Sequence, residues 1–211
     1  MTGFHVDIID FPLMKQHHEK EWTLVKREEL YSGYFKYLEA VMRYKKFDNS
    51  WSKKIRREIF ERGDAVAVLV YDPKKDTLVM VEQFRAGATR HPKGPWTLEI
   101  VAGTLEENES PKNCAIREVK EETGIDLEGE LVLISDHLVS PGATTERMWL
   151  FYAETDSDKA EGVFGLDSIG ENTKVVKISR KKALKMIEKN EIFVASVILA
   201  IYWLENKLKN E

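Results

Sequence analysis

The pattern of apolar and polar residues is clearest in the middle of the chain. Residues 65–71 form an unbroken apolar run, and the turn-forming segment 72–76 separates it from a second apolar stretch at residues 77–84. Two such stretches around a turn that contains Pro73 predict a β-hairpin buried on at least one face. Shorter stretches of the same kind predict further strands at residues 96–102, 131–138, 148–153 and 174–178.

One predicted helix has clear start and stop signals. Ser110 suits the N-cap, Pro111 suits the first helical position, and Gly124 stands where a left-handed residue ends a helix. Between these residues, apolar side chains recur at helical spacing, which predicts a helix with one buried stripe over residues 110–123.

Two more helices are predicted near the C-terminus, at residues 181–189 and 193–207. Strands therefore come first, then a central helix, then more strands and the terminal helices. This order of elements predicts an α/β (α+β) fold with a mixed sheet.

The first 62 residues differ in composition from the rest. They are charged and rich in aromatic residues, and partial alternation predicts strands at residues 39–44 and 54–60. A segment this short and polar does not bury enough apolar surface to form its own core. We therefore expect an N-terminal β-rich region, residues 1–62, that packs on the domain of residues 63–211 or on a second copy of the chain.

Composition narrows the classes of function. The chain has 211 residues and a formal net charge of -4, which argues against a dedicated nucleic-acid-binding protein because such proteins need a basic face. The first ten residues lack the pattern of a signal peptide, and the longest apolar run, residues 193–204, is too short to span a bilayer. No membrane association is predicted.

Cys114 is the one cysteine of the chain, so no disulfide can form within it. This favours a reducing, cytoplasmic compartment. Because Cys114 lies in the predicted central helix beside Ala115 and Ile116, we expect a packed core thiol rather than a nucleophile.

The central helix carries three glutamates that share one face, namely Glu118, Glu121 and Glu122. Residues three and four apart are neighbours on a helix, so these carboxylates repel each other unless a cation lies between them. A hard divalent cation such as Mg²⁺, bound by carboxylate and phosphate oxygens, satisfies this arrangement. Arg117, four residues before Glu121, can orient that side chain. The alternative is a solvated acidic helix face.

The residues around the helix favour the metal site. Gly103, Glu109 and the segment Arg117-Glu118-Val119-Lys120-Glu121-Glu122-Thr123-Gly124-Ile125 match the Nudix box at all nine specified positions over 23 residues. The chain therefore resembles the Nudix hydrolases, a family that hydrolyses a diphosphate linked to another group with the help of a divalent metal, usually Mg²⁺. The resemblance implies the Nudix fold, in which helices enclose a mixed sheet, here with a small N-terminal antiparallel sheet added.

The same resemblance implies a role for each residue of the box. Metal ligands are expected among three carboxylates and one backbone carbonyl: Glu118, Glu121, Glu122 and Ala102. Glu121 is also expected to assist catalysis. The other box residues are expected to be structural: Gly103, Glu109, Arg117 and Gly124. Two or three Mg²⁺ ions, or Mn²⁺ in their place, would neutralise the diphosphate and position a water molecule.

Four further segments resemble their counterparts in the bacterial ADP-ribose pyrophosphatases of this family. These segments are residues 56–63, 82–85, 96–103 and 140–147. The resemblance implies a nucleoside diphosphate sugar as substrate, with ADP-ribose as the first choice. It also implies a homodimer in which the N-terminal sheet is exchanged and completes the partner's substrate site.

The needs of such a substrate select candidate binding residues. Arginine grips phosphate with a rigid fork, so Arg57 and Arg85 are candidates. A base needs a flat partner, and Tyr34 matches the stacking position that the resemblance implies. Glu146 can accept hydrogen bonds from the substrate or support Arg85.

Each of these candidates has a structural alternative. Tyr34 and its neighbour Phe35 can simply pack in the N-terminal sheet. The charged candidates can form ordinary ion pairs: Arg57 with Glu58 or Glu61, and Glu146 with Arg147.

A general base is expected outside the helix. The resemblance places it in a loop before the last strand, here residues 161–172, and Glu171 is our choice. The glycines of this loop suit a lid that closes over the substrate. The loop is less acidic than the family's usual pattern, and a solvated loop residue is the alternative for Glu171.

Two other functions fit the same sequence. A GDP-mannose or other nucleotide-sugar pyrophosphatase would share the box and the dimer. A non-catalytic Nudix module that senses a ligand is the second alternative. Such modules usually have a damaged box and an additional DNA-binding segment, whereas this box is complete.

Overall fold

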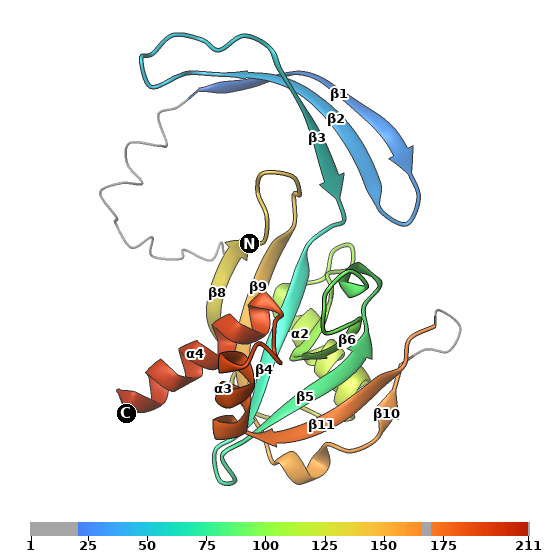
Figure 1. Ribbon diagram of the computed structural model, residues 1–211, viewed down its shortest axis with the longest axis vertical. Coiled ribbons are helices and arrows are strands. Elements are labelled where there is room, and N and C mark those ends of the chain that lie inside the picture. Colours follow the sequence, from blue (N-terminus) through green and yellow to red (C-terminus); the bar gives the residue numbers. More distant parts are fainter. Residues whose placement is uncertain (1–20, 166–169, 211) are drawn as a thin grey trace. The chain divides into compact units, whose positions relative to one another are not determined.

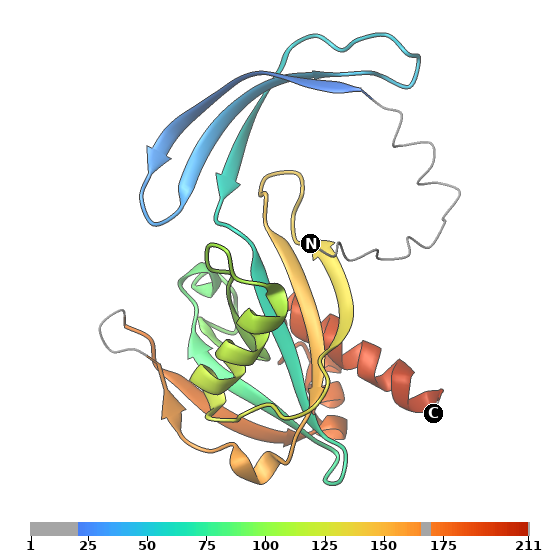
Figure 2. The same ribbon diagram turned by 180° about the vertical axis from the view of Figure 1, so that it is seen from behind.

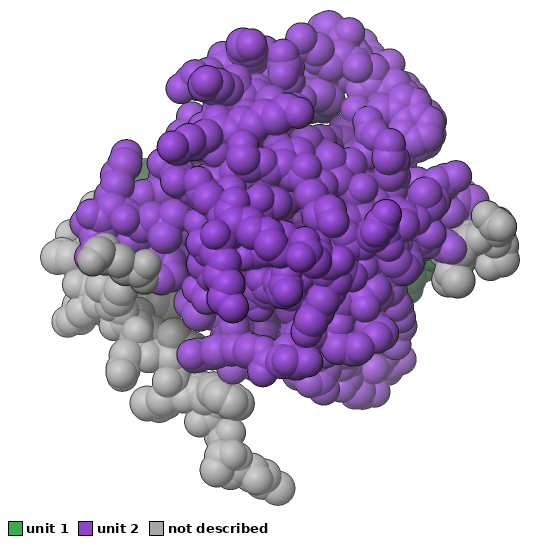
Figure 3. Space-filling view, turned by 90° about the horizontal axis from the view of Figure 1, so that it is seen from below, with its two compact units in different colours: residues 1–62, 142–145 green, residues 63–141, 146–211 purple. Residues whose placement is uncertain are grey.

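The computed structural model describes residues 21–165 and 170–210. The chain divides into two compact units, which Figure 3 colours separately. Unit 1 comprises residues 1–62 and 142–145, and unit 2 comprises residues 63–141 and 146–211.

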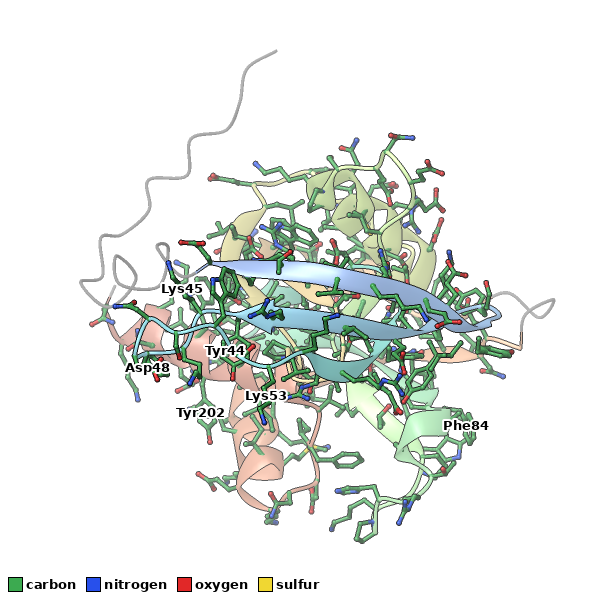
Figure 4. The ribbon with its side chains drawn as sticks, turned by 90° about the horizontal axis from the view of Figure 1, so that it is seen from above. Tyr44, Lys45, Asp48, Lys53, Phe84 and Tyr202 are labelled. Atoms are coloured by element: carbon green, nitrogen blue, oxygen red, sulfur yellow. The ribbon has the colours of Figure 1, made fainter. Side chains whose placement is uncertain are left out.

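Unit 1 contains a three-stranded antiparallel sheet with its second strand in the middle. The strands are β1 (Trp22–Ser32), β2 (Lys36–Tyr44) and β3 (Ile55–Glu61). Every residue of β1 is exposed, whereas Leu38 and Ala40 of β2 are buried. Figure 4 labels Tyr44, Lys45 and Asp48 at the end of β2 and in the turn that follows it.

Unit 2 contains the other elements of the described residues. Its strands are β4 (Ala65–Asp72), β5 (Thr77–Phe84), β6 (Trp96–Glu99), β7 (Val101–Thr104), β8 (Val132–Leu138), β9 (Arg147–Glu154), β10 (Val163–Phe164) and β11 (Thr173–Ser179). Its helices are α2 (Pro111–Thr123), α3 (Arg180–Glu188) and α4 (Ala195–Lys209), with short 3-10 turns η1 (Ala86–Ala88) and η2 (Ser157–Lys159).

The strands of unit 2 form one mixed sheet in the order β10-β11-β5-β4-β9-β8, while β6 pairs with β5 and β7 pairs with β4. The β4–β9 pair is parallel and the others are antiparallel. β4 lies at the centre of this sheet, and all eight of its residues are buried. The unbroken apolar run that predicted this strand is explained by burial of both of its faces.

Helices cover both faces of the sheet, as Figures 1 and 2 show from opposite sides. One face packs against α2 and contributes these side chains of β4 and β5: Val66, Val68, Val70, Val79 and Val81. The other face packs against α3 and α4 and contributes Ala67, Leu69, Tyr71, Leu78 and Met80. The predicted α/β (α+β) fold, with a mixed sheet between helices, is confirmed.

The apolar run at residues 193–204 belongs mostly to α4, where Val197, Ile201 and Leu204 are buried in the core. Among the described residues, no helix combines the length and the apolar character that a membrane crossing requires.

Two strand predictions need correction. The stretch 96–102 is two strands rather than one, because the chain passes at Ile100 from a ladder with β5 to a ladder with β4. β1 was not predicted, since its exposed residues on both faces give it no alternation of apolar and polar positions.

A buried carboxylate, Asp72, stabilises the turn between β4 and β5. Asp72 is 1% exposed, and its oxygens accept four hydrogen bonds: from the backbone N–H groups of Lys74, Lys75 and Ser157 at 3.0, 3.1 and 2.9 Å, and from the Ser157 hydroxyl at 2.7 Å. Burial alone would raise the pKa of Asp72, but these hydrogen bonds outweigh it and lower the pKa from 3.8 to about 2.

We expect Asp72→Asn to destabilise the protein by about 2 kcal/mol at pH 7. The asparagine amide places an NH₂ group where a carboxylate oxygen now accepts, so this NH₂ group would point at other hydrogen-bond donors. The folded-state pKa lies below the unfolded value, so this stabilisation is present above pH 3.8 and is lost as the pH falls towards 2. Urea unfolding of both proteins across this range measures the difference. A gap between the two proteins that stays constant down to pH 2 would contradict this account.

Candidate active site

Local sequence signals fix α2 against the sheet. The Ser110 hydroxyl caps the helix by accepting from the Asn113 N–H at 3.2 Å, and Gly124 ends it with a φ of 72°. The apolar side of α2 buries Cys114, Ala115 and Val119. The polar side of the helix therefore holds the glutamates of the box in fixed positions.

Glu118 lies against the backbone of β7. Its carboxylate occupies the space beside Gly103, where an added Cβ would lie 1.8 Å from Oε1. The Glu118 side chain is only 13% exposed, and burial raises its pKa in spite of the neighbouring Arg117. A glycine at position 103 is thus needed for the close approach of a carboxylate.

We expect Gly103→Ala to lower kcat/KM about a hundredfold while changing stability by less than about 1 kcal/mol. The new methyl group meets the end of a flexible side chain, so Glu118 moves and the backbone stays in place. Steady-state kinetics and thermal unfolding measure the two effects. If the variant loses its fold together with its activity, the backbone near position 103 has moved rather than the Glu118 side chain.

Glu122 is the second carboxylate that faces β7. Its Oε2 accepts a hydrogen bond from the Ala102 N–H at 3.3 Å. Burial, reinforced by the charge of Glu118, raises the pKa of Glu122 to about 8. Two carboxylates held close together in a largely buried place repel each other, and a cation bound between them would relieve this repulsion.

Arg117 links the loop before α2 to the helix. Its Nε and Nη2 donate to the two oxygens of Glu109, each at 3.0 Å, and its Nη1 donates to Glu118 at 2.7 Å and to Glu121 at 3.0 Å. A further bond from Nη2 reaches the Thr104 carbonyl at 3.3 Å. The expected structural residues Glu109 and Arg117 therefore lie in one network, which also orients Glu121 as predicted. Glu121 is the most exposed carboxylate of this group, at 57%.

The donor chemistry fits a hard divalent cation, which prefers carboxylate oxygens. Within residues 21–165 and 170–210, no three acidic, histidine or cysteine side chains converge on one point. The reason is that Glu118 is turned towards Arg117 and Glu122 towards Ala102.

Arg85 follows β5 and is held by a buried carboxylate. Its Nε and Nη2 donate to Glu99 at 3.0 and 2.9 Å. Burial opposes its charge, but Glu99 raises the pKa of Arg85 above the ordinary value, and the charges of Glu122 and Glu171 add to this effect. Arg85 is thus brought together with the carboxylates of the box.

Glu171 is exposed, yet its charge is felt by both Arg85 and Glu118. Its backbone passes over Gly165, where an added Cβ would lie 2.6 Å from the Glu171 carbonyl oxygen. The predicted base thus lies in the loop before β11, close enough to Arg85 and Glu118 for its charge to act on both. Residues 166–169 of the predicted lid lie outside the described residues.

The candidates Tyr34 and Arg57 belong to unit 1. Tyr34 is 89% exposed at the β1–β2 turn and contacts Phe35 edge to face, with ring centroids 4.7 Å apart. Arg57 is exposed on β3 and donates to the Arg56 carbonyl at 2.9 Å. The carboxylates considered as its ion-pair partners are engaged elsewhere: Glu58 with Tyr37, and Glu61 with Arg27.

Glu146 is 7% exposed at the start of β9 in unit 2. Arg147, which was considered as its ion-pair partner, donates to Asp136 and lies over the Trp149 ring at 4.3 Å. A buried carboxylate at this position is in keeping with a binding role.

Cys114 is fully buried, and burial raises the pKa of its thiol to about 12. A thiol in this state is not a nucleophile at neutral pH. This agrees with the expectation of a packed core thiol.

Sequence reasoning missed Glu99 and Thr97. Both lie in the segment 96–103 that carried a family resemblance, but no role was assigned to them. The available signal was a charged residue between the apolar residues Leu98 and Ile100 in a predicted strand, because a charge that becomes buried requires a partner.

Comparison with known proteins places this site in a family. The NUDIX domain model matches residues 61–182, which include the box, Arg85 and Glu171. The chain therefore belongs to the Nudix family.

The curated relatives have names that state an activity, whereas the domain model gives only the family. The chain is 38% identical to the ADP-ribose pyrophosphatase of Escherichia coli (strain K12) over 191 residues, covering 89% of this chain and 91% of the relative. It is 34% identical to the ADP-ribose pyrophosphatase of Haemophilus influenzae, with 89% and 87% covered. It is 31% identical to a GDP-mannose pyrophosphatase of Escherichia coli O1:K1 / APEC, with 87% and 94% covered.

A solved structure described as an ADP compounds hydrolase has the same fold. It superposes with a TM-score of 0.68 at 17% identity and covers 90% of this chain and 95% of its own.

Proposed function

We propose that this protein uses Mg²⁺ to hydrolyse the diphosphate of ADP-ribose to AMP and ribose 5-phosphate, or that of a closely related nucleoside diphosphate sugar to the nucleoside monophosphate and the sugar phosphate. The observation that carries the proposal is the pair Glu118 and Glu122, two largely buried carboxylates packed on β7 whose pKa values are both raised by burial. The relatives named ADP-ribose pyrophosphatase support the choice of substrate.

The glutamates of the box would bind the metal, and Arg117 would orient them. Glu118 and Glu122 would hold two or three Mg²⁺ ions, or Mn²⁺, with Glu121 and the Ala102 carbonyl assisting. When bound, the metal supplies positive charge to the diphosphate and lowers the pKa of a water molecule. Arg117 keeps Glu118 and Glu121 oriented, because it donates to both.

Arg85 would grip the diphosphate beside the metal. Its guanidinium is fixed through Glu99, so it presents positive charge without a large loss of entropy on binding. Glu171, which is exposed and whose charge helps to raise the pKa of Glu118, would accept the proton of the attacking water. Tyr34 and Arg57 of unit 1 and Glu146 of unit 2 would complete the substrate site in a dimer.

A substrate panel tests this proposal. With Mg²⁺ present, we expect kcat/KM for ADP-ribose to exceed that for GDP-mannose at least about tenfold, which corresponds to about 1.4 kcal/mol of transition-state binding. The second candidate, a GDP-mannose pyrophosphatase, is favoured by the 31% identical relatives and predicts the reverse order. Repeating the panel with Mn²⁺ establishes the preferred metal.

We also propose a homodimer with exchanged N-terminal sheets. In unit 1 the strand β1 exposes large apolar side chains along its length: Trp22, Leu24, Val25, Leu30 and Tyr31. Such a surface is typical of an interface that a partner covers. Light scattering is expected to give twice the chain mass, and a stable, active monomer would overturn this part of the proposal.

We place the protein in the cytoplasm as part of the same proposal. Its single cysteine is a buried free thiol, which suits a reducing compartment. Fractionation of cells followed by immunodetection tests this assignment.

A further inference from the structure

Three side chains form a chain of hydrogen bonds on the face of the sheet that α2 covers. In the β5–β6 ladder, Val81 pairs with Glu99 and Gln83 pairs with Thr97. Alternate residues of a strand share a face, and Val81 packs in the cluster that contains the buried residues of α2. Thr97 and Glu99 therefore lie on the same face of the sheet as the box.

Glu99 is held from two sides. Its Oε1 accepts from the Thr97 hydroxyl at 2.6 Å and from Arg85 Nε at 3.0 Å, while its Oε2 accepts from Arg85 Nη2 at 2.9 Å. Thr97 is 2% exposed and Glu99 is 7% exposed. In a buried place these charge-assisted bonds are strong and directional.

The Thr97 hydroxyl has a single proton and two acceptors within reach. The carboxylate of Glu99 is at 2.6 Å, whereas the backbone carbonyl of Gln83 is at 3.4 Å. The shorter bond to a charged acceptor takes the proton. This bond stops the carboxylate from rotating about its last torsion, which is otherwise broad.

A fixed carboxylate fixes the guanidinium that it binds. Two nitrogens of Arg85 are committed to Glu99, and among the residues that the structure describes Nη1 has no protein partner. The planar fork of arginine therefore points its third nitrogen in a direction set by Glu99. That direction is set in turn by Thr97.

We propose that Thr97 is a positioning residue that acts through Glu99 to aim Arg85 at the diphosphate of the substrate. This inference rests on the proposed function only for the identity of the substrate. The alignment of Arg85 by Thr97 is a property of the protein alone, so it has a test of its own.

The first test separates binding from chemistry. Thr97→Val removes the hydroxyl and keeps the shape of the side chain. We expect it to raise KM for ADP-ribose about tenfold while kcat changes less than about twofold, because the bond lost is one to a charged group. Thr97→Ser keeps the hydroxyl and is expected to stay within about twofold of the wild type in both constants.

A double-mutant cycle tests whether Thr97 acts on the substrate through Arg85. In an Arg85→Met background, Thr97→Val is expected to have no further effect on kcat/KM, because the group that Thr97 aims is absent. The same loss in both backgrounds would overturn the proposal. If Thr97→Val fails to fold, Thr97→Ala enters the same cycle.

Ser157→Ala is a matched control. It also removes a buried hydroxyl that donates to a buried carboxylate, Asp72, at 2.7 Å, but it lies at η2, away from the box. It is expected to lower stability and leave KM unchanged. A rise in KM equal to that of Thr97→Val would point to a general loss of stability instead of positioning.

A measurement without substrate distinguishes the two proposals. In ¹⁵N NMR, the Arg85 Nε–H is expected to exchange with water at least about tenfold faster in Thr97→Val than in the wild type, since a weakened hydrogen bond opens more often. Equal exchange rates would overturn the role of Thr97. Faster exchange in a protein that hydrolyses no nucleoside diphosphate sugar would instead overturn the proposed function alone.

Discussion

Replacing Glu122 by glutamine is expected to lower kcat/KM for ADP-ribose about a thousandfold or more, since the metal it would hold supplies several kcal/mol of transition-state stabilisation. The amide keeps the size of the side chain and still accepts from the Ala102 N–H. It removes the negative charge that a cation requires. Glu118→Gln is expected to have an effect of the same order.

The fold should tolerate this change. Burial raises the pKa of Glu122 to about 8, which means that the ionised carboxylate is costly in its place when no cation is bound. Without added metal, Glu122→Gln is therefore expected to unfold at a temperature no lower than that of the wild type. Circular dichroism measures this midpoint, and the paramagnetic signal of Mn²⁺ measures loss of metal binding in the same samples.

Glu188→Gln provides the control, because Glu188 is an exposed glutamate on α3, on the other face of the sheet. It should match the wild type in kcat/KM and in Mn²⁺ binding. Hydrolysis that continues unchanged in both Glu118→Gln and Glu122→Gln would exclude these two glutamates as the metal site. A wild-type protein that hydrolyses no nucleoside diphosphate sugar would instead favour the non-catalytic, ligand-sensing module.

The box could be predicted in detail because its signals are local. Ser110, Pro111 and Gly124 define the ends of α2 through contacts within a few residues, and the spacing of the glutamates follows from helical geometry. The close approach of Glu118 to Gly103 was not visible in this way. It depends on the packing of α2 on β7, which spacing along the chain does not describe.

The pairing of Arg85 with Glu99 could not be predicted from the sequence, because it depends on contacts between strands. A run of apolar residues predicts that 96–102 is extended, but not that the chain changes partner at Ile100. That change leaves Glu99 opposite Val81 and within reach of Arg85. Because strand register depends on the whole sheet, the sequence suggested Arg85 as a phosphate ligand without its buried partner.

The N-terminal region was the least predictable part. Partial alternation of apolar and polar residues predicted β2 and β3. β2 buries Leu38 and Ala40, and β3 pairs with β2. β1 is exposed along its length and therefore has no pattern of burial to detect.

Replacing Arg117 by methionine is expected to have the largest effect on stability, about 3 kcal/mol at pH 7, since one partner of a partly buried ion pair is removed. The Glu109 side chain is 14% exposed, and the hydrogen bonds from Arg117 outweigh burial and lower the pKa of Glu109 to about 2. Its folded-state pKa is below the unfolded value of 4.5, so this stabilisation is present above pH 4.5 and is lost as the pH falls towards 2.

Urea unfolding at pH 7 measures the loss, and Arg147→Met is the matched control. Arg147 also binds a carboxylate, Asp136, with two nitrogens, but these side chains are 47% and 33% exposed. An exposed pair is expected to contribute less than about 1 kcal/mol. Equal losses in the two variants would mean that Arg117 contributes only a surface ion pair. A much larger loss at Arg117 would identify it as the residue that joins the loop of Glu109 to the glutamate-bearing face of α2, because the same guanidinium also binds Glu118.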